Sequence, residues 1–176
     1  MYMVVSNRRD FFHRCAVIGA GISTGFVSSE LLTGRAFAMR TIVGGNVGRI
    51  VILSFERGEL FLEGIRDKAK ELGIKNAVLL SVIGTFEKAV FHRVKNLNTI
   101  AESEIITVNA PIELSSVSGV IANGVPHFHM VFSDLDKTYS GHLEEGCVVL
   151  YLAEAVLAEL KGVELIRRPL LQEKVE

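Results

Sequence analysis

The stretch that decides the fold is residues 127–147, which read HFHMVFSDLDKTYSGHLEEGC. Successive side chains of a strand point to opposite faces, so this alternation predicts a strand with histidines on one face and apolar residues on the other. The first face carries His127 and His129, and the second carries Phe128, Met130 and Phe132. The following Asp134–Lys137 has the composition of a tight turn. The stretch therefore predicts a β-hairpin with one buried face.

The register of this hairpin brings a third histidine to the same face. If the loop is centred on Leu135-Asp136, His129 lies directly opposite His142, and directly opposite residues share a face. Three imidazoles then converge, with Cβ atoms about 5 Å apart across the ladder.

A second turn gives an independent check on the register. Asn123-Gly124 is a strong two-residue turn signal just before the hairpin. It pairs the preceding strand with residues 127–133 so that Phe128 covers Gly119, an aromatic ring over a residue with no side chain.

Three converging histidines are typical of a metal site. Neutral imidazole nitrogens bind zinc at about 2.0–2.1 Å, and three protein ligands leave one coordination position open. The same spacing also fits ordinary polar residues on the solvent-facing side of an antiparallel sheet, and from the spacing alone this alternative stays open. We expect His127, His129 and His142 to bind a zinc-like ion. No catalytic residue is indicated, because Glu144 and Glu145 fit a solvated loop after the strand.

Composition excludes several classes of protein. The chain has 176 residues, 49% of them hydrophobic, and a formal net charge of −1. This length and apolar content indicate one soluble globular domain with a sizeable core. A nearly neutral chain without basic clusters has no bulk attraction to nucleic acid or to an anionic membrane. Cys15 and Cys147 have no metal-site spacing and predict free thiols.

The first 38 residues resemble an export signal. Arg8-Arg9 followed by Phe11-Phe12 resembles the twin-arginine motif, and residues 15–29 form an uncharged, mildly apolar segment. Ala36-Phe37-Ala38 fits an A-x-A cleavage pattern. We therefore expect a twin-arginine signal peptide at residues 1–38, a mature domain at residues 39–176, export to the periplasm or the extracellular space, and no stable membrane anchor after cleavage.

Two other interpretations of residues 1–38 compete with an export signal. If Met39 is the true start, the protein is cytoplasmic, and this alternative stays open. The glycines at 19, 21 and 25 resemble a dinucleotide-binding loop, but no βαβ unit surrounds them and no acidic residue follows at the required distance. A dinucleotide cofactor is therefore excluded.

The mature chain predicts more strands than helices. Runs of β-branched and apolar residues predict strands at residues 49–55, 76–85, 88–95, 99–108, 113–122, 147–160 and 163–168. Residues 147–160 also contain strong helix formers, and we assign them to a strand on the basis of Cys147–Tyr151. His92 falls on an alternating strand, where a lone histidine is most often a surface residue, and we leave it out of the site.

One helix is expected after Arg57-Gly58. Apolar residues recur there at helical spacing, and Gly73 is a natural stop. The predicted fold class is α+β, a large and mostly antiparallel sheet with one main helix packed on a face.

Several motifs together resemble the PPC domain, the plants and prokaryotes conserved domain that also occurs in AT-hook nuclear proteins. They are Arg57-Gly58-Glu59-Leu60, Ser81-Val82-Ile83-Gly84, residues 114–119, Pro126-His127-Phe128-His129, Gly141-His142-Leu143, Gly146-Cys147 and Arg167-Arg168. The resemblance covers residues 49–168. It implies a homotrimer of α/β subunits built on a curved antiparallel sheet, with zinc bound by the residues that match His127, His129 and His142.

The chain departs from this family in ways that bear on function. It has no Arg-Gly-Arg-Pro hook, Ser54 stands where arginine is usual, and Ser140 stands where glycine is usual. Nucleic acid is therefore not an expected partner. We expect an exported homotrimer that binds a zinc-like metal and recognises a small ligand or a protein partner. A DNA-binding regulatory protein and a zinc-dependent hydrolase or lyase remain as alternatives.

Overall fold

The fold was obtained as a computed structural model, which describes residues 2–3, 41–98, 100–167 and 174–175. The predicted twin-arginine motif, the cleavage pattern and Cys15 lie outside the described residues. The strands are β1 (Tyr2–Met3), β2 (Asn46–Glu56), β3 (Ala77–Val94), β4 (Glu102–Ala122), β5 (Val125–Ser133), β6 (Thr138–Leu143), β7 (Val148–Lys161), β8 (Ile166–Arg167) and β9 (Lys174–Val175), and the helix is α1 (Phe61–Glu71).

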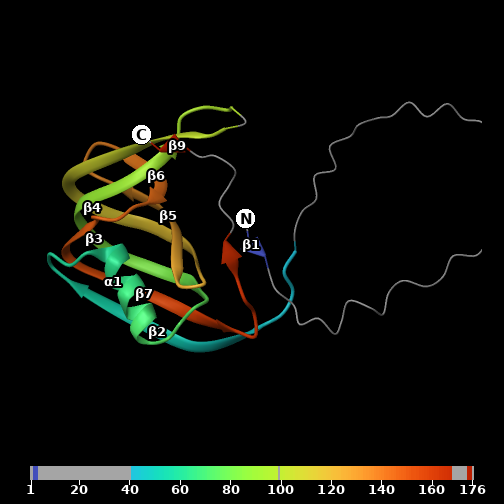
Figure 1. The fold of residues 1–176 in the computed structure, drawn as a ribbon. Coiled ribbons are helices and arrows are strands. Elements are labelled where there is room, and N and C mark those ends of the chain that lie inside the picture. The colour runs from blue at the N-terminus through green and yellow to red at the C-terminus, as the bar shows by residue number, and fades with distance from the viewer. Residues whose placement is uncertain (1, 4–40, 99, 168–173, 176) are drawn as a thin grey trace, which may run out of the picture.

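Seven strands form one sheet in the order β2-β7-β3-β6-β5-β4-β9. Figure 1 shows that this sheet is strongly curved. The long strand β3 also pairs with β4, so the antiparallel pairs β3–β4, β4–β5, β5–β6 and β6–β3 close on themselves. The core fills the inside of this closed part and continues under α1. Its largest fully buried side chains include Phe61, Phe86, Phe91, Phe128 and Phe132.

Helix α1 covers the face of β2 and β7 that is continuous with the core. Phe61, Ile65 and Ala69 are buried at helical spacing, and the Phe61 ring packs 5.1 Å from that of Phe55 on β2. The chain leaves the helix at Gly73, whose φ of +68° favours glycine. The predicted helix and its stop are confirmed.

The predicted α+β class is wrong. Helix α1 has 11 residues and is the only helix in the part of the chain that the structure describes, whereas strands build the core and carry the histidines. The fold is a mostly antiparallel β-structure with one short helix.

The structure lacks two breaks that were predicted between neighbouring strands. Four predicted short strands therefore form two long ones, and the fold contains more sheet than expected. The two strands predicted at residues 76–85 and 88–95 form the single strand β3 (Ala77–Val94), and the two predicted at residues 99–108 and 113–122 form the single strand β4 (Glu102–Ala122). Pro111 does not end β4 because it lies in a bulge, where the register to β3 jumps from Phe86↔Ile112 to Lys88↔Asn109. At a bulge the missing N–H of proline breaks no ladder hydrogen bond.

The strand predicted at residues 147–160 is present as β7 (Val148–Lys161). β7 lies between β2 and β3, and its Ala153, Ala155 and Leu157 alternate as buried residues. Pairing on both sides overrides the helix propensity of its alanines and leucines. No helix within the described ranges is long and apolar enough to cross a membrane.

Candidate metal centre

The β5–β6 hairpin has the predicted register. His129 lies directly opposite His142, and the four-residue loop between the strands is centred on Leu135-Asp136. Asp134 fixes this loop, because its Oδ1 accepts hydrogen bonds from the backbone N–H groups of Asp136 at 2.8 Å and Lys137 at 2.7 Å. These bonds to the charged form lower the pKa of Asp134.

The pairing with β4 confirms the second register prediction, Phe128 opposite Gly119. Gly119 has a φ of +147°, and a Cβ atom at this position would overlap the backbone carbonyl of His127. The close approach of β4 to β5 thus requires a glycine beside the histidine strand. It seats Phe128 in the core, which turns His127 and His129 outward.

The three predicted histidines converge on the outer face of the sheet. Their ring centroids are separated by 5.3 Å for His127–His129, 4.8 Å for His127–His142 and 5.2 Å for His129–His142. Tetrahedral zinc bound by imidazoles would hold ring centroids about 5 Å apart. One ligand atom from each ring lies within 4.8 Å of the others. The arrangement fits a metal after small ring rotations.

The electrostatic surroundings keep these rings neutral. Burial lowers the pKa of His142 to about 3 and that of His127 to about 4, with further contributions from His92 and Arg167 respectively. The pKa of His129 is lowered as well, first by burial. A neutral imidazole offers the lone pair that a metal ion needs.

His92 and Glu144 join the cluster, although the predicted ligand set left both of them out. His92 on β3 lies opposite His142 on β6, and its Nδ1 is 2.5 Å from Oε1 of Glu144. The same oxygen is 3.9 Å from Nε2 of His142. The alternation of residues 88–95 placed His92 on an outer face, but the β3–β6 pairing that brings it to His142 joins strands distant in sequence.

His92, His142 and Glu144 form a second group with ligand atoms within 4.8 Å. The rings of His92 and His142, however, stack with centroids 4.5 Å apart and planes at 24°. Stacked rings direct their nitrogens side by side, whereas ligands of one ion must converge. His127, His129 and His142 are therefore the better ligand set, and His92 with Glu144 supports it from one side.

Cys147 lies near the cluster in sequence but is not a ligand candidate. It is a free, buried thiol, as predicted, and its Sγ accepts a hydrogen bond from the backbone N–H of Val90 at 3.1 Å. Burial raises the pKa of this thiol to about 12, so the thiolate that binds metals is not formed at neutral pH.

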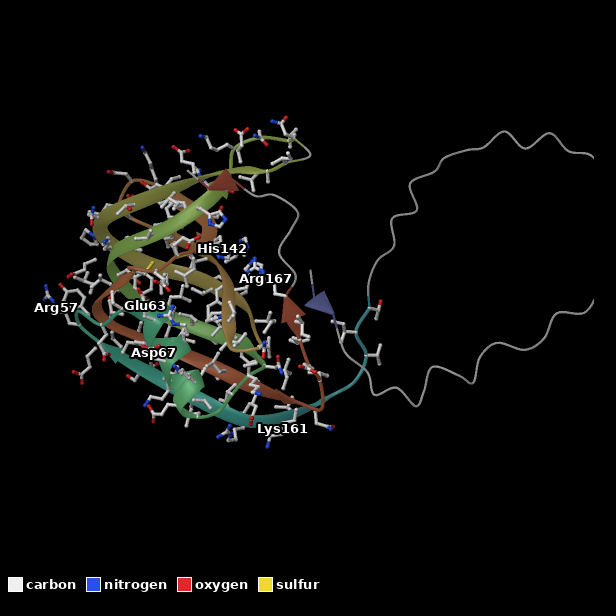
Figure 2. The ribbon with its side chains drawn as sticks, in the orientation of Figure 1. Arg57, Glu63, Asp67, His142, Lys161 and Arg167 are labelled. Atoms are coloured by element: carbon white, nitrogen blue, oxygen red, sulfur yellow. The ribbon has the colours of Figure 1, made fainter. Side chains whose placement is uncertain are left out.

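Arg167 borders the cluster on another side. Its Nη2 lies 3.4 Å from Nε2 of His127, and Figure 2 shows the arginine beside the region of His142. The sequence motifs included Arg167 but gave it no role. The cluster thus has three convergent imidazoles, a histidine–glutamate pair and a guanidinium.

Comparison with known families matches residues 43–161 to the Plants and Prokaryotes Conserved (PCC) domain. Among curated proteins, the bifunctional protein GlmU of Synechococcus sp. (strain JA-3-3Ab) is 24% identical over 122 residues. This match covers 69% of the present chain but only 19% of that protein.

Solved structures share the fold. A plant- and prokaryote-conserved (PPC) protein of Pyrococcus horikoshii is 26% identical with a TM-score of 0.63, over 78% of this chain and 99% of that chain. The metal-containing protein AF0104 of Archaeoglobus fulgidus is 23% identical with a TM-score of 0.60, over 70% and 87%. A protein of Bacteroides thetaiotaomicron that is named as a candidate DNA-binding protein is 17% identical with a TM-score of 0.56, over 68% and 86%.

Proposed function

This chain belongs to the Plants and Prokaryotes Conserved domain family, and we propose that within this fold it binds one zinc-like ion per subunit through His127, His129 and His142. The observation that carries the proposal is the set of three ring separations between 4.8 and 5.3 Å, which suits tetrahedral zinc. The name of the Archaeoglobus neighbour, a metal-containing protein, is consistent with this function. The bound metal would serve to recognise a small ligand or a protein partner.

The proposal is tested by metal analysis and by titration of the purified protein with zinc. Wild type should bind one ion per subunit. His129→Ala should abolish stoichiometric binding, because two remaining rings cannot define the site. Val131→Ala is the matched control, since Val131 lies two residues along the same strand on the same exposed face. If His129→Ala retains one ion per subunit, these histidines are ordinary residues on a wet sheet face.

We also propose that the protein is a homotrimer. The face of β2, β7 and β3 that points away from α1, here called the apolar sheet face, carries exposed large hydrophobic side chains. Ile50 is 54% exposed, Ile52 69% and Ile83 57%. Ile52 pairs with Val156, and Ile83 pairs with Glu154 on the same face of β7. A subunit that leaves such a face open favours association with its own copies.

Export through the twin-arginine route is a proposal that rests on residues 1–38, outside the described ranges apart from β1. A fusion of residues 1–45 to a reporter that must fold before export tests it. Replacement of Arg8 and Arg9 by lysine should stop export, and unchanged export of this variant would contradict the proposal.

A zinc-dependent hydrolase or lyase is the second candidate, and the position of Glu144 favours it. Its carboxylate lies 3.9 Å from Nε2 of His142, so it is close enough to a bound ion to act on a metal-bound water. DNA binding has less support, because the formal net charge of −1 provides no electrostatic attraction to phosphates.

A further inference from the structure

Arg167 is the cationic side chain in contact with the candidate metal centre. It lies on the short strand β8, and its Nη2 is 3.4 Å from Nε2 of His127. A guanidinium has five N–H donors and no acceptor, so in the absence of an ion it donates to the Nε2 lone pair of His127. An ion bound at Nε2 would replace this hydrogen bond and leave the donors of Arg167 available to another acceptor. Within the described part of the chain, no carboxylate lies at ion-pair distance from Arg167.

A metal ion at this position would create an unbalanced charge. Three neutral imidazoles leave the two positive charges of a zinc-like ion uncompensated, and Arg167 adds a third beside His127. The carboxylate that faces the cluster, Glu144, is already held at 2.5 Å by His92. A metal ion with an open coordination position beside the guanidinium of Arg167 favours an anion that binds to the ion and to the guanidinium together.

The same face offers neutral hydrogen-bond donors. Ser118 on β4 lies directly opposite His129 and is exposed. Ser140 on β6 is two residues from His142, so it shares its face, and it is exposed as well. Hydroxyl donors beside a guanidinium are typical of sites that hold carboxylate or phosphate oxygens.

We infer that the candidate metal centre takes a small oxyanion, a carboxylate or phosphate group of its ligand, and that Arg167 binds the oxygens that the metal does not. The inference rests on the metal binding proposed above and names the ligand class of that site. The planar fork of arginine matches both oxyanions in a two-point contact, which lysine cannot reproduce.

The test uses the full-length protein loaded with cobalt(II), whose visible spectrum reports on its coordination. Acetate and inorganic phosphate are titrated separately at constant ionic strength, with chloride as the reference anion. Wild type should show a saturable spectral change with acetate, with phosphate or with both. The anion that binds with the higher affinity identifies the ligand class as carboxylate or phosphate. Arg167→Gln should bind cobalt but weaken that oxyanion at least about 10-fold. Arg57→Gln is the control, since Arg57 lies over the Tyr151 ring, away from the cluster in Figure 2.

A merely structural role for Arg167 predicts a different result. Arg167→Gln would then lower the melting temperature and leave the anion titration unchanged, which overturns the inference. Arg167→Lys keeps the charge without the fork and should weaken the oxyanion to a smaller degree, so it decides the question if the glutamine variant does not fold. Cobalt binding without any response to acetate or phosphate overturns this inference alone. Failure of wild type to bind cobalt overturns the metal centre and this inference together.

Discussion

His92 and His142 lie directly opposite each other on β3 and β6, and their rings stack with centroids 4.5 Å apart. The stack joins the β5–β6 hairpin to a strand that precedes it by about fifty residues in sequence. The Nδ1 atom of His92 also contacts Oε1 of Glu144, so the ring of His142 is confined before any ligand binds. A confined ring loses less conformational freedom when it coordinates an ion, which favours affinity.

The first prediction follows from this support. His92→Ala should keep one ion per subunit but weaken zinc affinity about 10-fold or more, in the range measured for partners that orient metal ligands. Glu144→Gln should give a smaller loss, because it keeps a hydrogen-bond acceptor. Competition titration with a chelating dye measures both. Complete loss of the ion in His92→Ala would show instead that His92, His142 and Glu144 are the ligands.

The second prediction concerns pH. An isolated histidine has a pKa of about 6.5, which by itself predicts loss of metal as pH falls through that value. Burial lowers the pKa to about 4 for His127 and about 3 for His142, so in the folded protein protons compete with the metal only at lower pH. The pKa of His129 is lowered as well, so the loss of zinc on acidification should have its midpoint below the ordinary histidine value of about 6.5. A titration series in non-coordinating buffers checks this, and a midpoint near 6.5 would contradict it.

The hairpin could be predicted from sequence because its determinants are local. Asn123-Gly124 and residues 134–137 set two turns, and a two-residue period then fixes which side chains share a face. The pairing of β3 with β6 depends on closure of the sheet, which no local pattern encodes, so His92 was assigned to the surface. Pro111 misled the strand prediction for the same reason, because only the register to β3 shows that it lies in a bulge.

The third prediction tests the glycine that seats the histidine strand. Gly119→Ala should destabilise the protein by at least about 3 kcal/mol, because the added Cβ overlaps backbone rather than a movable side chain and the φ of +147° is strained. Gly58→Ala is the matched control. Gly58 also has a positive φ, +84°, but a Cβ there meets nothing within 4 Å, so it should lose only about 1 kcal/mol. Urea unfolding compares the two, and equal losses would contradict the prediction.

The fourth prediction concerns acid stability. The side chain of Arg49 on β2 donates two hydrogen bonds to Glu159 on β7, Nε–Oε2 at 2.9 Å and Nη2–Oε1 at 3.1 Å, and its backbone N–H donates a third to Oε2 at 3.2 Å. The hydrogen bonds from Arg49 lower the pKa of Glu159 to about 2, from an ordinary value of 4.5. Between these two values the unfolded chain binds a proton that the folded protein does not, so stability falls as pH drops from 4.5 to 2. Glu159→Gln should flatten this part of a plot of stability against pH, because it removes the carboxylate whose pKa differs between the folded and unfolded chain. Urea unfolding at each pH measures this, and an unchanged slope would contradict the prediction.

The last prediction tests the proposed trimer through the apolar sheet face. Light scattering should give a stable oligomer, three subunits by our proposal, at micromolar concentration. Ile52→Asp should dissociate it, because Ile52 is 69% exposed in the isolated subunit and a carboxylate buried at an interface loses its hydration. The variant should still fold, since Ile52 points away from the core.

Leu135→Asp is the control for this variant. Leu135 is 91% exposed in the β5–β6 loop, away from the apolar sheet face, and its replacement should leave the assembly intact. A wild-type monomer, or an Ile52→Asp oligomer of unchanged mass, would show that the apolar sheet face is not the subunit interface.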